Sequence, residues 1–190
     1  ARIALEIEKL NDRLAIDAFL GKGTVAVTEI ASGSPSLCAV PDTARPHLDR
    51  RLTAGETKES AVAEVREAAL RAGVPDAGVF VPEHHGPSHT GRIVPYEKFF
   101  PTWVLEESSP WLKKAASAHK ELFGRGPNID KWTFSTNGVG IMPAYGIPCL
   151  GFGPGGEPQA HAADEYCPVE DLTFAAAFYA ALAATISERS

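Results

Sequence analysis

Residues 147–166 have the sequence IPCLGFGPGGEPQAHAADEY, a short apolar run followed by a glycine-rich loop. Ile147 to Phe152 has the length and character of a buried strand, and the glycines after it favour a turn. Open α/β sheets bind ligands beyond the carboxyl ends of their strands. His161 follows this loop, and Glu165 lies four residues further on. We therefore predict His161 as the metal-ligand candidate, with Glu165 either supporting it or facing the last helix, although a lone histidine is more often structural.

Three other patterns resemble ligand sites, but their context argues against each. Residues 151–156 fit G-x-G-x-x-G, yet the helix that should begin at the third glycine is replaced by Glu-Pro-Gln-Ala. The glycine and proline at positions 86 and 87 prevent a helix that would align neighbouring histidines on zinc. Acidic residues just before a helix favour its dipole. We therefore expect no nucleotide site. We expect His84, His85 and His89 to lie in a polar surface loop. We expect Glu106 and Glu107 to have a structural role before the helix.

The segments around the glycine-rich loop predict a layered second block. Amphipathic or apolar patterns predict helices over 111–123 and 169–186, and short strands over 132–135 and 147–152. Residues 136–138 are Thr-Asn-Gly, a turn sequence. We interpret the order as α-β-α-β-α, which is typical of a sheet covered by helices.

The first hundred residues predict a different arrangement. Apolar residues at helical spacing from Ile3 indicate a helix over 3–20, and a second helix is predicted over 58–72. Strand-like runs predict one antiparallel sheet with both helices on one face, formed by 24–30, 37–52 and 77–82. One more strand before residue 1 would give a ferredoxin-like split βαβ sandwich. Because the chain opens inside a helix without a cap, we expect that it was processed, was deliberately shortened or has lost an N-terminal portion.

Composition bounds the function of this 190-residue, 20.2 kDa chain. It is 44% hydrophobic and 22% charged, which excludes disorder and a membrane protein. The apolar run 172–186 is shorter than a bilayer span of about 20 residues, so we expect a buried helix and no membrane association. A net charge of −6 argues against nucleic-acid binding. Three cysteines without a CxxC pair, and no basic-then-apolar leader, indicate a reducing cytoplasm.

The glycine-rich string and its histidine resemble a known family. GFGPG at 151–155 followed by AHAADEY at 160–166 is similar to the ending of aminoacylase/carboxypeptidase-type co-catalytic zinc hydrolases, which include succinyl-diaminopimelate desuccinylase and acetylornithine deacetylase. Three further strings resemble the branch labelled selenium-metabolism hydrolases: FLGKGTVAVTE at 19–29, DRRLTAGET at 49–57 and KWTFSTNGVGIM at 131–142.

The resemblance implies a zinc-binding α/β domain into which a ferredoxin-like lid is inserted. Residues 1–104 would be the lid and dimerisation domain without its first strand, and 105–190 the C-terminal segment of the catalytic domain. The substrate would be a small peptide or N-acyl amino acid, hydrolysed with two zinc ions and a glutamate base. The resemblance also implies that His161 is a zinc ligand, and that Asn137 and Gly138 lie in a turn that faces the substrate.

The resemblance also implies what is missing. The family's other metal ligands and its general base lie upstream of the lid, so this chain supplies one zinc ligand and no identifiable catalytic group. Gly138, Val139 and Gly140 stand where many relatives carry Asp-x-Arg for a substrate carboxylate. We therefore expect that this chain is part of an amide hydrolase and forms a homodimer. We also expect that the chain by itself is inactive. The alternative is a non-catalytic dimerisation module.

Overall fold

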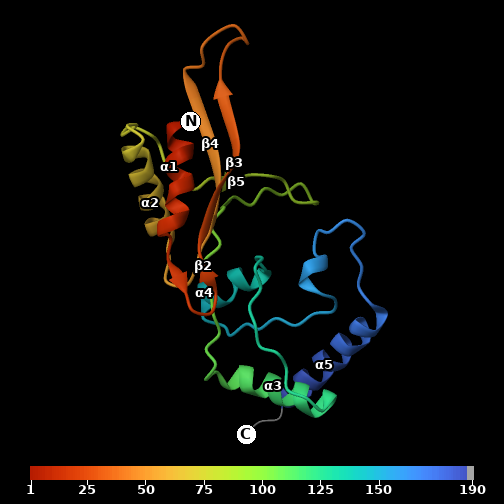
Figure 1. Ribbon diagram of the computed structural model, residues 1–190. Helices are drawn as coiled ribbons and strands as arrows, with labels where there is room; N and C mark the ends of the chain where they lie inside the picture. Colours follow the sequence, from red (N-terminus) through yellow and green to blue (C-terminus); the bar gives the residue numbers. More distant parts are fainter. Residues whose placement is uncertain (188–190) are drawn as a thin grey trace. The chain divides into compact units, whose positions relative to one another are not determined.

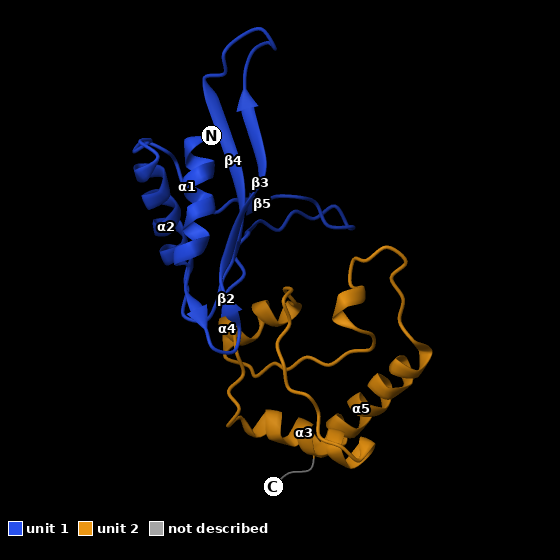
Figure 2. Cartoon of the chain, viewed as in Figure 1, with its two compact units in different colours: residues 1–102 blue, residues 103–190 orange. Residues whose placement is uncertain are grey.

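A computed structural model describes residues 1–187, and the chain divides into two compact units, Ala1–Thr102 and Trp103–Ser190 (Figure 2). The described residues mix helices with short antiparallel strands. The α+β character expected from the sequence is therefore confirmed in its coarse form. The two units are described in turn.

The first unit opens with a helix that is shorter than predicted. Helix α1 spans Arg2–Leu10 and continues only as a 3-10 turn over Asn11–Arg13 (Figure 1). Residues 14–20 are not helical, and they carry strand β1 (Ile16–Asp17), which pairs with β2 (Gly21–Lys22). The predicted helix over 3–20 is therefore wrong beyond residue 13. The reason is the side chain of Asn11, which bonds to the backbone of a distant residue and so competes with helix continuation.

A long hairpin forms the centre of this unit. Strand β3 (Thr24–Gly33) pairs antiparallel with β4 (Thr43–Arg51), with a bulge between Val27 and Glu29 (Figure 1). The strand predicted at 24–30 is thus confirmed, and the run predicted at 37–52 is a strand over 43–51. Residues 37–40 form a turn instead of the predicted strand, because the Ser34 hydroxyl donates to the Ser36 and Ala39 carbonyls and closes the hairpin end.

Helix α2 spans Lys58–Arg71 and lies beside α1 (Figure 1). The Thr57 hydroxyl caps this helix by accepting from the Ser60 N–H, and the Ser60 hydroxyl accepts from the Thr57 N–H. Both helices pack on one face of the hairpin, as predicted. Their shared core contains buried side chains from α1, its continuation, β3 and α2: Ile7, Leu10, Leu14, Val25 and Ala68.

The third predicted strand of the sheet does not form. Residues 77–82 form no strand, although the Pro82 carbonyl accepts from the Lys98 N–H at 2.8 Å. The next strands, β5 (Glu83–His84) and β6 (Tyr96–Glu97), pair with each other. The described residues therefore contain three separate two-stranded sheets. The strand prediction fails because a strand is stabilised by its neighbours, and within the described residues a later segment reaches 77–82 only at Pro82.

The second unit is helical in its described part. Helix α3 (Pro110–Phe123) begins after Ser109 and ends at Gly124, which has a φ of 71°. It is followed by a 3-10 turn at Asn137–Gly140, the short helix α4 (Met142–Tyr145), a 3-10 turn at Glu157–Gln159, and α5 (Val169–Ser187). The strands predicted at 132–135 and 147–152 are absent among the described residues, so the layered sheet expected here is not formed by this chain.

Helix α5 packs against α3 but leaves most of its surface open. Only Ala175 and Phe178 are buried, whereas Val169, Phe174 and Tyr179 are more than half exposed. The prediction of a buried helix is therefore wrong for the described residues. Within residues 1–187, α5 is also long and apolar enough to cross a membrane, a weak indication because core helices of soluble proteins meet the same criterion.

Candidate functional site

The turn predicted to face a substrate is held by its own backbone and by one aromatic ring. The Thr136 hydroxyl accepts from the Gly138 N–H at 3.2 Å, and the Val139 N–H donates to the Thr136 carbonyl. Asn137 is exposed at the apex, and Gly138 is half-buried. A Cβ atom placed at Gly138 would lie 2.6 Å from Cζ2 of Trp103, so the indole leaves no room for a side chain there.

The glycine-rich loop is anchored to the last helix. The Gly155 N–H donates to the Asp171 carboxylate in the first turn of α5 at 3.2 Å. The Phe152 ring lies 4.2 Å from that of Phe178, and its carbonyl accepts from the Tyr179 hydroxyl. No strand leads into this loop in the described residues, but its position against α5 is defined by these contacts, from the first turn to the middle of the helix. The loop is therefore placed by α5 rather than by a sheet.

His161 lies beyond this loop, exposed and in a left-handed backbone conformation with a φ of 61°. Its N–H donates to the Glu165 carboxylate at 3.2 Å, which closes the segment between the two residues. Glu165 therefore contacts the backbone of His161 rather than the imidazole. Among the described residues, no hydrogen bond occupies either ring nitrogen of His161, so the imidazole is free to bind another group.

A groove of about 480 Å³ lies beside this segment. Its walls are the stacked rings of Trp132 and Phe134, 5.3 Å apart, together with the glycine-rich loop and Glu165. Glu157 also lines it and accepts from the Thr133 N–H at 2.9 Å and hydroxyl at 2.6 Å. The Thr133 hydroxyl and N–H lower the pKa of Glu157, so its carboxylate stays charged in this groove.

The alternative metal candidates are not brought together. The His85 imidazole lies 3.0 Å from the Glu83 carboxylate, and the His84 ring contacts Tyr96 at 5.0 Å. Glu106 and Glu107 lie just before α3, as expected, and the first turn of that helix carries no acidic residue. Over residues 1–187, no three His, Cys, Asp or Glu side chains are arranged to hold a metal ion, and the three cysteines are free.

Sequence reasoning missed two features of this region. The Trp132–Phe134 stack follows from aromatic residues at alternate positions, a signal that was present in the sequence. The contact between Trp103 and Gly138 joins positions that are far apart in the chain, so no local sequence pattern predicts it.

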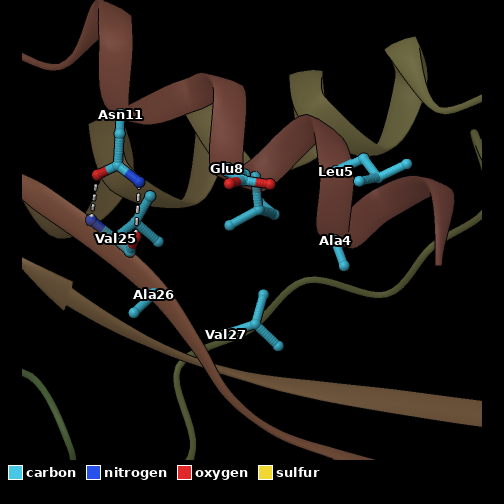
Figure 3. A pocket seen from close by; sticks show the side chains of 8 residues that line it. Ala4, Leu5, Glu8, Asn11, Val25, Ala26 and Val27 are labelled. Carbon is cyan, nitrogen blue, oxygen red and sulfur yellow. Dashed lines mark hydrogen bonds between the residues drawn. The ribbon is translucent and has the colours of Figure 1, made fainter.

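A second groove lies in the first unit, between α1 and β3 (Figure 3). Asn11 closes one end of it with two hydrogen bonds to Val25, a donor bond to the carbonyl at 2.8 Å and an acceptor bond from the N–H at 2.9 Å. Glu8 and Leu5 line it from α1, opposite Ala26 and the half-buried Val27. Its lining is mostly apolar, and it lies along the outer edge of β3.

Comparison with known proteins identifies the family. Residues 5–185 match the model of peptidase family M20/M25/M40. Two curated relatives, each called uncharacterized protein YgeY, from Escherichia coli strain K12 and Escherichia coli O157:H7, are each 49% identical over 179 residues. The aligned region covers 93% of this chain but 44% of each relative, so the chain spans less than half the length of the curated relatives it matches. Because the family match extends over nearly the whole chain, the chain belongs to peptidase family M20/M25/M40.

Proposed function

We propose that this chain is part of a zinc-dependent hydrolase that cleaves amide bonds in small peptides or N-acyl amino acids. The observation that carries the proposal is the match to a peptidase family over residues 5–185. The free imidazole of His161 beside the glycine-rich loop supports it. The other strings quoted above favour the selenium-metabolism branch of these hydrolases.

The residues of this chain do not by themselves fit a catalytic zinc ion. Such a site takes about three protein ligands and keeps one position open. His161 is exposed, and the described residues offer no cluster of three ligating side chains around it. We therefore assign His161 as one ligand of a metal site that other residues of the whole protein complete, and Glu165 as the residue that orders the His161 backbone.

The exposed surface of the second unit favours completion by further polypeptide. Predicted strands at 132–135 and 147–152 are unpaired, and α5 exposes Phe174 and Tyr179. Strands and apolar helix faces are stable when neighbouring elements cover them. We propose that the remainder of the protein pairs with these segments and covers the apolar surface of α5, so that this helix does not lie in a membrane. Asn137 and Gly138 then face the substrate.

The first unit is proposed as a ferredoxin-like lid that forms a homodimer. Both outer edges of the β3–β4 hairpin lack a strand partner among the described residues, and an open edge favours pairing with another strand. Asn11 occupies the outer edge of β3 at Val25, which leaves the part of the strand beyond Val25 for pairing. A non-catalytic dimerisation module is the second candidate, favoured by the absence of a clustered metal site within residues 1–187.

Hydrolysis assays separate the two functions. The chain is purified alone and co-expressed with an N-terminal portion from the same gene, and each sample is assayed with zinc on a panel of dipeptides and N-acyl amino acids. We expect cleavage only in the co-expressed sample, abolished by a chelator. Cleavage by the 190-residue chain alone that is insensitive to a chelator would contradict the zinc proposal. Absence of cleavage and of bound zinc in both samples would favour the dimerisation module.

A further inference from the structure

The groove beside the glycine-rich loop has an aromatic wall that is held in place. The Trp132 and Phe134 rings lie nearly parallel, with an interplanar angle of 17°, and the two residues are 43% and 44% exposed. The Trp132 indole also packs on the backbone of Gly151, where an added Cβ would lie 2.0 Å from Cη2. Both aromatic residues line the groove, so the stack offers open ring surface to a ligand there.

A carboxylate in the same groove is tied to the segment that carries the aromatic wall. Thr133, which lies between the two aromatic residues in sequence, donates its N–H at 2.9 Å and its hydroxyl at 2.6 Å to the same Glu157 oxygen, Oε1. Within the described residues, the second oxygen, Oε2, accepts no hydrogen bond. The two Thr133 donors therefore fix the carboxylate and leave one of its oxygens open to a donor from a ligand.

The charge and size of the groove favour a small cation. Besides Glu157, the groove is lined by Glu165, and none of the described residues that line it is basic. Its volume of about 480 Å³ falls within the range of about 300–1,000 Å³ that is usual for small-molecule sites. A cation is attracted to an aromatic face, and a guanidinium is also planar, so it can stack on a ring while its N–H groups donate to a carboxylate.

We propose that this groove binds a guanidinium group, which lies against the Trp132–Phe134 stack and donates hydrogen bonds to Glu157. His161 lies between Ala160 and Glu165 in the same loop, and both of these residues line the groove. The guanidinium is therefore assigned to an arginine side chain of the substrate, an assignment that rests on the proposed function. The binding of a guanidinium by the groove does not depend on it.

An NMR titration of the 190-residue chain tests the binding. Nα-acetyl-arginine amide is added while the Trp132 indole N–H and the Gly155 amide are followed, and Nα-acetyl-citrulline amide, which has the same shape without the charge, is the matched control ligand. We expect saturable shifts with the arginine compound, and an affinity at least about fivefold lower for the citrulline compound. Equal binding of the two compounds, or no shift with either, would overturn the proposal.

Two variants test the two features of the groove separately. Glu157→Gln keeps an acceptor for Thr133 and removes the charge, and Phe134→Leu keeps an apolar side chain and removes the ring. Each should weaken arginine binding by about threefold or more. Glu107→Gln, at an exposed carboxylate outside the groove, is the matched control and should leave the affinity unchanged. Unchanged affinity in both groove variants, or an equal loss in Glu107→Gln, would show that the cation binds elsewhere.

Hydrolysis by the co-expressed protein tests the substrate assignment. We expect kcat/KM to be about fivefold or more higher for Nα-acetyl-arginine than for Nα-acetyl-citrulline, and we expect Glu157→Gln to remove this preference. Guanidinium binding by a protein that hydrolyses no substrate would disprove the proposed function and leave the groove's ligand intact. Hydrolysis without an arginine preference, in a protein whose groove binds no guanidinium, would do the reverse. If Glu157→Gln fails to fold by circular dichroism, Phe134→Leu and the citrulline comparison still decide the question.

Discussion

Asn11→Ala should destabilise the first unit strongly. Figure 3 shows the Asn11 amide bonded to both polar backbone groups of Val25, at 2.8 and 2.9 Å. Both groups of one strand residue point to the same side, so Asn11 occupies the edge of β3 that β4 does not pair. Val25 is 4% exposed. Alanine would leave a buried N–H and a buried carbonyl without their partner.

The expected cost is about 2–3 kcal/mol, from about 1 kcal/mol for each lost hydrogen bond and a further contribution from the unsatisfied groups. For a unit of this size, 1 kcal/mol shifts the midpoint by about 4–8 °C, so the thermal transition of this unit should fall by about 8–24 °C.

Urea unfolding followed by far-UV circular dichroism measures this change. Asn11→Ala should lower the midpoint without altering the slope, whereas Asn128→Ala, at an exposed asparagine, should change the free energy of unfolding by less than about 0.5 kcal/mol. Asn11→Asp keeps the acceptor and loses the donor, so it should fall between alanine and wild type. A free energy of unfolding for Asn11→Ala within about 0.5 kcal/mol of wild type would refute the account of this edge.

Two further predictions concern charged side chains. Glu56→Ala should cost about 2–4 kcal/mol in the free energy of unfolding, because the largely buried Arg50 guanidinium then keeps one carboxylate partner, Glu64, and the Arg51 carbonyl. The exposed pair of Glu67 and Arg71 offers a control, and Glu67→Ala should cost under about 1 kcal/mol. The Glu157 pKa is lowered by its bonds to the Thr133 hydroxyl and N–H, so this carboxylate stabilises the folded state above its ordinary pKa of 4.5, and the contribution disappears as pH falls through the lower folded value. In an NMR titration, Thr133→Val should raise the Glu157 midpoint toward 4.5, and an unchanged midpoint would show that the hydroxyl is not the cause.

Local signals predicted the helices whose ends are defined by their own sequence. Thr57 caps α2 within one turn, Pro110 stands at the start of α3, and Gly124 ends α3 in a conformation that favours glycine. The predicted first helix was too long because the apolar spacing continues past Asn11. The side-chain bonds of Asn11 that end α1 go to Val25, which is distant in the sequence.

The strands were harder to predict because a strand depends on its partners. The run 24–30 pairs with β4 within the chain and forms. The runs 132–135 and 147–152 are also largely apolar, yet they pair with no strand in the described part of the chain. The Trp103–Gly138 contact joins residues that are far apart in sequence, so it became visible only in the fold.

The metal content of the co-expressed protein tests the central claim most directly. Wild-type protein, His161→Ala and the control His89→Ala are purified with the N-terminal portion, and zinc is counted by elemental analysis. We predict about two zinc ions per chain in wild type and in His89→Ala, and a clear loss of zinc with a large loss of hydrolysis in His161→Ala. Full zinc occupancy in His161→Ala, or loss of zinc in His89→Ala, would contradict the assignment of His161 as the ligand that this chain contributes.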